Sequence, residues 1–321
     1  MPVRFGTPGL GGQTESFLRK GQWEAGFAYR RLYADKWFIG TEVDESLPIL
    51  PLYLEINSYD LSVAYGLTNQ LSLQLTLPFS YGTHSRIYPE ADNLRHEVSA
   101  GGLGDINLIG TYWIWDPHTH LNGNLSFGLG VKTPSGSNTV HSTITLADGT
   151  VVPKLVDQSI QLGDGGWGVI FQSQAYWSMF RALYGYFDGT YLMSTKESTD
   201  VPSPLGPNVP LAVPDVYSAR AGLALPLWAK IGLSASLGGR IDGIPKRDVV
   251  GGGDLAFRRP GYIVYVDPGI GVAIGPHTLT VNVPVRVYQD FQPALINDQI
   301  GNRGGGDLAD YLIIAQYTFR F

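Results

Sequence analysis

The sequence predicts an all-β fold, a transmembrane antiparallel β-barrel of about 12 strands with short periplasmic turns and long extracellular loops. Three observations carry this prediction. Apolar and polar residues alternate with period two over stretches of about ten residues, which is typical of strands with one apolar and one polar face. The links between these stretches are alternately short and long. The last stretch ends on an aromatic residue, Phe321.

Residues 311–321 show the alternation most completely. One face of this stretch would carry Tyr311, Ile313, Ala315, Tyr317, Phe319 and Phe321. The other face ends in Gln316, Thr318 and Arg320. A final strand of this kind resembles the C-terminal assembly signal of bacterial outer-membrane barrels. We therefore expect Tyr317, Phe319 and Phe321 to act as a membrane assembly signal.

The composition agrees with a barrel. Of the 321 residues only 16% are charged, against roughly 25% in typical soluble domains. The mean hydropathy is close to zero, and the sequence has no apolar run of about 18 residues that would predict a membrane helix. A net charge of -6 without a Lys/Arg cluster argues against nucleic acid as a partner. The absence of cysteine is compatible with an oxidising compartment.

The N-terminal residues carry no signal-peptide pattern, because no basic segment followed by an apolar one is found in residues 1–20. We expect that a signal peptide has already been removed. Residues 1–20 would then form a periplasmic segment that can plug the barrel, and residues 21–321 a single transmembrane barrel.

The strands follow in order along the chain. The first six are expected at 22–33, in a stretch ending near 67, and at 71–82, 105–115, 121–132 and 167–179. The other six are expected at 183–194, 216–227, 230–242, 262–274, 279–288 and 311–321. The stretch 71–82 alternates most cleanly, with leucine or an aromatic residue at every odd position. Pro78 and Pro284 are unfavourable inside central strands because proline cannot donate a ladder hydrogen bond.

Five tight turns alternate strictly with six long loops in this assignment. In outer-membrane barrels the tight turns are periplasmic and the long loops extracellular, and the strand number is even. Both termini would therefore lie on the periplasmic side. The longest loop spans about 134–165, and a Pro-rich loop spans 196–215.

If the apolar rows face lipid, then the polar rows face the lumen. The expected lumen-lining residues are Glu24, Arg30, Asp60, Lys132, Asp188, Arg220, Lys230, Arg240, Asp267, Arg286 and Arg320. Charges of both signs on successive strands have two interpretations. They form salt-bridge ladders that brace a filled lumen, or they line a polar path for a solute. A barrel of this size lies between small filled barrels and wide 16-strand porins. Its size is therefore compatible with both interpretations of the interior charges.

Catalytic and metal sites are not predicted. Some outer-membrane barrels of this size are lipid hydrolases with a serine two residues after a histidine, and none of the six histidines has serine at that offset. His118 and His120 share a face but are too few for a metal site. The segment Gly251–Ala256 is repeated at 304–309, which indicates either two flexible loops or a calcium-binding rim. We expect no enzyme activity, no cofactor and no metal.

Several Gly-rich motifs carry a family resemblance. They are Gly101-Gly102-Leu103-Gly104-Asp105-Ile106, Phe127-Gly128-Leu129-Gly130-Val131-Lys132-Thr133-Pro134-Ser135-Gly136, Leu162-Gly163-Asp164-Gly165-Gly166-Trp167-Gly168, Gly21-Gln22-Trp23-Glu24 and Tyr29-Arg30-Arg31. With these motifs the chain resembles the outer-membrane transporter family named for the phenol meta-degradation pathway. The resemblance covers most of the chain and implies an outer-membrane channel associated with uptake of hydrophobic or aromatic compounds. It implies neither a particular substrate nor binding residues.

The predicted function is passive uptake of small solutes through a barrel channel in the outer membrane of a Gram-negative bacterium. Its partners would be outer-membrane lipid, lipopolysaccharide and a small-molecule solute. The alternative is a structural or scaffold barrel with a plugged lumen. Such a barrel would dock partner proteins through its extracellular loops, of which 134–165 and 196–215 are large enough.

Overall fold

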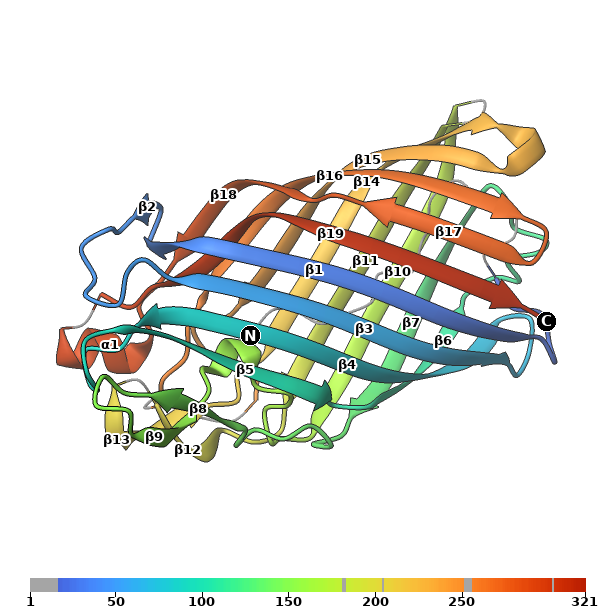
Figure 1. Cartoon of the computed structure of the whole chain (residues 1–321). Helices are drawn as coiled ribbons and strands as arrows, with labels where there is room; N and C mark the ends of the chain where they lie inside the picture. The colour runs from blue at the N-terminus through green and yellow to red at the C-terminus, as the bar shows by residue number, and fades with distance from the viewer. Residues whose placement is uncertain (1–16, 181–182, 204, 251–255, 302) are drawn as a thin grey trace.

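The computed structural model describes residues 17–180, 183–203, 205–250, 256–301 and 303–321. It is an antiparallel β-barrel with 12 strand positions, and β19 (Gly306–Arg320) pairs with β1 (Trp23–Ile39) to close it. Figure 1 shows these two strands side by side, with the C-terminus at the end of the barrel that carries the tight turns. The predicted fold class and strand number are confirmed.

The wall follows the chain order. The first six positions are β1 (Trp23–Ile39), β3 (Tyr53–Gly66), β4 (Leu71–Ile87), β5 (Arg95–Leu103) with β6 (Asn107–Trp113), β7 (Gly123–Lys132) and β10 (Gly168–Phe180). The other six are β11 (Leu183–Ser194), β14 (Val216–Trp228), β15 (Leu233–Ile244), β16 (Gly261–Ile274), β17 (His277–Asn282) with β18 (Val285–Phe291), and β19 (Gly306–Arg320). Each neighbouring pair is antiparallel, as a barrel of successive hairpins requires.

The outer face of the barrel is apolar. Large side chains such as Phe27, Leu61 and Leu129 are 42%, 46% and 62% exposed. A continuous apolar surface of this kind is what a barrel presents to lipid. The apolar band ends at the level of Tyr29, because the next outward residue on β1, Arg31, forms an ion pair with Glu55 at 3.0 Å.

No helix among the described residues is long and apolar enough to cross a membrane.

Two wall positions are broken, in contrast to the continuous strands expected there. The eleventh breaks between β17 and β18, where Pro284 lacks the N–H that a ladder needs. The fourth is divided into β5 and β6 by residues 104–106. The link between the strands expected at 71–82 and 105–115 is largely strand, because β4 and β5 form a hairpin that extends beyond the membrane. There one face meets water and the other packs against the cap through Val98 and Ala100, so the lipid-facing apolar row is absent.

The extracellular loops contain structure that the alternation did not predict. The additional elements are β2 (Glu42–Val43), β8 (His141–Thr145), β9 (Val151–Leu155), η1 (Gln158–Ile160), β12 (Ser198–Ser203), β13 (Gly206–Ala212) and α1 (Leu295–Ile300). Figure 1 shows β8, β9, β12, β13 and α1 gathered at the end of the barrel opposite the C-terminus. We call β8, β9, η1, β12, β13 and residues 256–260 the cap.

The cap has its own apolar contacts. Val201 and Leu211 pack with Phe257 in one buried cluster. A second cluster joins Ile160 of the cap to Leu54 and other inward residues of the wall. The cap is therefore a folded unit that is seated on the inner side of the barrel wall.

Candidate functional site: the barrel interior

The predicted lumen residues include a buried charged network on β11, β14, β15 and β16. Arg220 Nε donates to Asp188 Oδ2 at 3.0 Å, and Arg220 Nη1 lies 3.8 Å from Asp267 Oδ2. Arg240 pairs with Asp242 at 2.9 Å. Because a buried charge is costly without a partner, this side of the interior has the character of a salt-bridge ladder.

A second pair closes the seam of the barrel near its periplasmic end. Glu24 and Arg320 are directly opposite one another on β1 and β19. Their side chains form an ion pair in which Arg320 Nε lies 2.7 Å from Glu24 Oε2. An ion pair thus joins the first and last strands in addition to their backbone hydrogen bonds.

Lys132 brings three of the Gly-rich motifs together. Its Nζ donates to Asp105 at 2.9 Å, to Asp164 at 2.5 Å and to the Gly166 carbonyl at 2.8 Å. Asp105 also accepts a hydrogen bond from Gly136 N at 2.9 Å. We call Lys132, Asp105 and Asp164 the clasp. It fixes the start of the longest loop at the point where β5 and β6 separate.

The other predicted lumen residues do not belong to one network, and each lies in a different part of the barrel. Arg30 lines a cavity beneath the cap, and Asp60 lies on the inward face of β3. Arg286 pairs with Asp310 and lies over the Phe38 ring. Lys230 differs, because it lies exposed in the tight turn η2 (Ala229–Ile231) and not in the wall. A role for the wall residues in lining a solute path stays a prediction.

The predicted assembly residues lie at the end of β19. Tyr317 is 39% and Phe321 is 62% exposed, and the Phe319 and Phe321 rings stack with centroids 5.6 Å apart. His277 of β17 contacts both Tyr317 and Phe319. The residues form part of the aromatic surface near the tight turns, and their role in assembly stays a prediction.

The N-terminal segment reaches the interior at residue 17. Phe17 is buried, and its ring centroid lies 4.7 Å from that of Trp113 and 5.2 Å from that of Tyr176. A Cβ on Gly66 would lie 2.1 Å from the Arg19 carbonyl oxygen, so only glycine allows this close approach. Residues 17–20 therefore pack against the wall, and the rest of the proposed plug lies outside the described residues.

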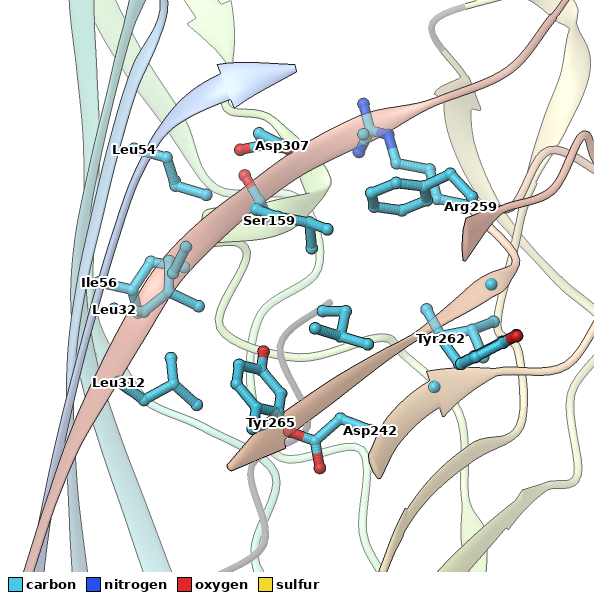
Figure 2. A pocket seen from close by; sticks show the side chains of 18 of the residues that line it. Leu32, Leu54, Ile56, Ser159, Asp242, Arg259, Tyr262, Tyr265, Asp307 and Leu312 are labelled. Atoms are coloured by element: carbon cyan, nitrogen blue, oxygen red, sulfur yellow. The ribbon is translucent and has the colours of Figure 1, made fainter. Parts of the chain in front are cut away.

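A cavity of about 120 Å³ lies between the cap and the wall. Figure 2 shows Leu32, Leu54, Ile56 and Leu312 on one side of it. Ser159, Arg259 and Asp307 line the cavity as well, and Tyr265 and Asp242 border it further down the barrel. The cavity is thus amphiphilic, with an apolar wall supplied by the strands and a polar end near the cap.

Ion pairing joins the polar end of the cavity to the cap. Arg259 Nη1 lies 3.4 Å from Asp157 Oδ1. Burial opposes ionisation of Asp157, but Arg259 and the backbone N–H of Ser159 outweigh it and hold the pKa of this carboxyl well below its usual range. Asp157 is therefore charged at any physiological pH.

Sequence reasoning missed Ser159, Arg259 and Asp307, because the first two lie in expected loops and the third in an expected loop before the last strand. Two signals were available, namely the pair Arg258-Arg259 in a chain with few charges and the repeated segment 304–309, which contains Asp307. No group of three or more potential ligands arranged for a metal is found among the described residues. The first copy of the Gly-rich repeat lies largely outside them, and the second leads into β19.

A closed barrel of 12 antiparallel strand positions with an apolar outer band defines a bacterial outer-membrane β-barrel protein. No protein-family model and no curated protein matches the chain. Among solved structures, the chain is similar to an outer-membrane channel from Pseudomonas putida F1, with 13% identity and a TM-score of 0.65 over 95% of this chain and 97% of that chain. At this identity the similarity establishes a shared fold.

Two further solved structures match less well. One is a FadL homologue from Pseudomonas aeruginosa, with 7% identity and a TM-score of 0.45 over 93% of this chain and 90% of that chain. The other is the CymD monoaromatic hydrocarbon channel, with 11% identity and a TM-score of 0.42 over 95% of this chain and 89% of that chain.

Proposed function

We propose that this protein is a passive outer-membrane channel for small, largely apolar solutes. The observation that carries the proposal is an amphiphilic cavity inside a lipid-embedded barrel, directly beneath a folded cap. A solute would enter at the cap, occupy the cavity and leave along the interior towards the periplasm. The similar barrel from Pseudomonas putida F1 is described as an outer-membrane channel, which supports the same class of function here.

Selectivity in this proposal comes from the interior and from the loops, since passive channels select by pore size, charge and gating. The charged network on β11 to β16 is internally paired and leaves little free charge to attract ions. We therefore expect a narrow conduction path with low ion throughput. The apolar wall beneath the cap favours solutes that a water-filled porin would pass poorly.

A scaffold function is the second candidate. Its supporting observation is the folded hairpin β12–β13, which extends at the cap and carries Pro202 and Pro210. A barrel of this kind would have its interior braced by ion pairs such as Arg220–Asp188 and would use the cap as a docking surface.

Reconstitution of the full chain into planar bilayers and liposomes separates the two functions. The channel proposal predicts discrete conductance steps and measurable flux of a small aromatic solute into liposomes. A heat-unfolded sample inserted in the same way serves as the control. Folded, inserted protein that gives neither conductance nor flux would overturn the channel proposal and favour the scaffold.

A further inference from the structure

We propose that a recess on the extracellular side of the cap is a binding site for a small organic carboxylate. The recess is separate from the cavity beneath the cap and shares no lining residue with it. It lies between the hairpin of β8 and β9 and the strand β12, at the end of the barrel opposite the C-terminus (Figure 1). The inference goes beyond the proposed function, because a site in this position binds its ligand whether or not the barrel conducts.

The recess has the size and the surface of a small-molecule site. Its volume of about 390 Å³ lies within the roughly 300–1,000 Å³ of typical ligand pockets. Leu155, Val201 and Pro202 supply its apolar surface. The rest of the lining is polar or glycine, and none of the lining residues is acidic. A ligand with an apolar body and one polar end therefore matches the recess.

Lys196 supplies the recess with a cation that has no protein counter-ion. It lines the recess, is exposed, and makes no ion pair within the described part of the chain. By contrast, the lysine and the two arginines of the cap each pair with a carboxylate, at 2.9 Å for Lys154, 2.7 Å for Arg258 and 3.4 Å for Arg259. An unpaired cation beside a recess without acidic residues attracts an anion.

The backbone on both sides of Lys196 is held in place. Thr195 N donates to the Trp167 carbonyl oxygen at 3.0 Å. The Glu197 carbonyl oxygen accepts a backbone hydrogen bond from Val213 N at 3.1 Å. The stem of Lys196 therefore starts from a fixed point at the edge of the recess.

Two further polar side chains border the recess. The Asn138 side chain makes no hydrogen bond within the described part of the chain, so its amide is available to a ligand. A Cβ on Gly165 would lie 2.5 Å from Asn138 Nδ2, so glycine at this position leaves the space that the amide occupies. His141 is oriented by its own loop, because its Nδ1 lies 2.8 Å from the Thr139 carbonyl oxygen.

The chemistry of these groups selects the ligand. The ammonium group of Lys196 can only donate, and the amide of Asn138 has two N–H donors, so a carboxylate can accept from either. A cation is repelled by Lys196. An uncharged molecule forgoes the charge-assisted hydrogen bond, which is roughly twice as strong as a neutral one. An anion without an apolar body leaves Leu155 and Pro202 uncovered, which favours an organic carboxylate.

The test uses probes that separate charge from apolar body. Cyclohexanecarboxylate, cyclohexylmethanol and cyclohexylmethylamine share one ring and differ in charge, and acetate has the carboxylate without the ring. Binding to the full chain in an uncharged detergent is measured by ligand-observed NMR, with empty micelles as the blank. We expect cyclohexanecarboxylate to bind about threefold to tenfold more tightly than the alcohol, and at least about tenfold more tightly than acetate.

Salt and the other probes give the opposing outcomes. The preference for the carboxylate over the alcohol should shrink as the salt concentration rises, because a partly exposed charge is screened. Equal affinity for the carboxylate and the alcohol, tighter binding of the amine, or acetate bound as tightly as cyclohexanecarboxylate would overturn the inference.

Two variants assign the effect to the recess. Lys196→Met removes the charge but keeps an unbranched side chain, so it should abolish the preference for the carboxylate over the alcohol. Lys230→Met, in the exposed tight turn at the other end of the barrel, makes the same change in net charge and should leave the preference intact. A Lys196→Met protein with an unchanged far-UV spectrum that still prefers the carboxylate would contradict the site.

Conductance measured on the same preparations keeps this inference apart from the channel function. Selective binding of cyclohexanecarboxylate without conductance would leave the site standing and overturn the channel. Conductance without selective binding would support the channel and overturn the site.

Discussion

At the scale of single residues, Lys132 is a buried cation whose ammonium group donates to two carboxylates and one carbonyl. Its side chain is 7% exposed and is held between two carboxylates that are similarly buried. Lys132→Met should destabilise the protein by about 3–5 kcal/mol, since it leaves Asp105 and Asp164 buried without their cation. Urea unfolding in lipid vesicles measures the change.

A matched control is available in the cap. Lys154 pairs with Glu90 at 2.9 Å, but Glu90 is 45% exposed. Lys154→Met should therefore cost at most about 1 kcal/mol, as surface ion pairs generally do. Equal effects of the two substitutions would show that the clasp is no stronger than a surface pair.

The clasp also marks the limit of what the sequence could predict for single residues. The three Gly-rich motifs were recognisable as motifs, and Lys132 was predicted to face inwards. Their meeting point was not predictable, because the motifs are separated in sequence by about thirty residues each. Only the path of the longest loop brings Asp164 back to Lys132. The partners of buried charges generally depend on such return paths.

Ionisation of Glu90 makes the local stability of the protein depend on pH. Burial raises the pKa of this carboxyl, but hydrogen bonds from Arg86 and Lys154 outweigh it and lower the pKa to about 2. The ordinary value is 4.5. Ionised Glu90 therefore contributes stability that is fully present above about pH 4.5 and is lost as the pH falls towards 2.

We expect amide hydrogen exchange in residues 88–94 to be nearly constant between pH 7 and pH 5, after correction for the intrinsic exchange rate. Protection should fall below about pH 4. Glu90→Gln should remove the acid-dependent step. A loss of protection already near pH 6 would contradict this assignment to Glu90 and point to a histidine.

At the scale of elements, the N-terminal segment has one clear anchor, Phe17. Each aromatic pair that it forms with Trp113 and Tyr176 is worth about 0.5–1.5 kcal/mol beyond its buried area. Phe17→Ala should release the segment from the interior and raise the single-channel conductance. The control is Phe180→Ala, which removes an aromatic residue that is 73% exposed on the outer surface. Conductance unchanged by Phe17→Ala would show that the segment does not restrict the path.

The sequence predicted the strands well where lipid contacts one face, and poorly elsewhere. In β4 the alternation from Leu71 to Tyr81 identified the membrane-facing part but not the extension to Ile87. Beyond the membrane the faces of a strand meet water or the cap and no face meets lipid. The alternation of apolar and polar residues therefore no longer indicates a strand. For the same reason β8, β9, β12 and β13 were expected as loops. Their pairing depends on contacts within the cap, such as the bridge between Leu211 and Phe257.

At the scale of the whole molecule, two folded units are combined, a wall that is closed by β19 and β1 and a cap seated inside its extracellular end. The cluster around Ile160 joins the cap to the wall, but Phe257 packs with Val201 and Leu211 in a separate cluster within the cap. The cap can therefore loosen while the wall stays intact. In the channel proposal, such loosening would open the extracellular end without any rearrangement of the barrel.

Phe257→Ala tests this separation. Removing a buried phenylalanine ring costs about 3–5 kcal/mol, and here the loss should fall on the cap alone. We expect faster proteolysis within residues 196–215, an unchanged urea midpoint for the barrel, and a higher and noisier conductance. The matched control is Phe171→Ala, on the outer face of β10 and 45% exposed, which should leave proteolysis and conductance unchanged. If the cap loosens and the conductance stays at zero, the lumen is closed below the cap, and the scaffold function becomes the better account of the molecule.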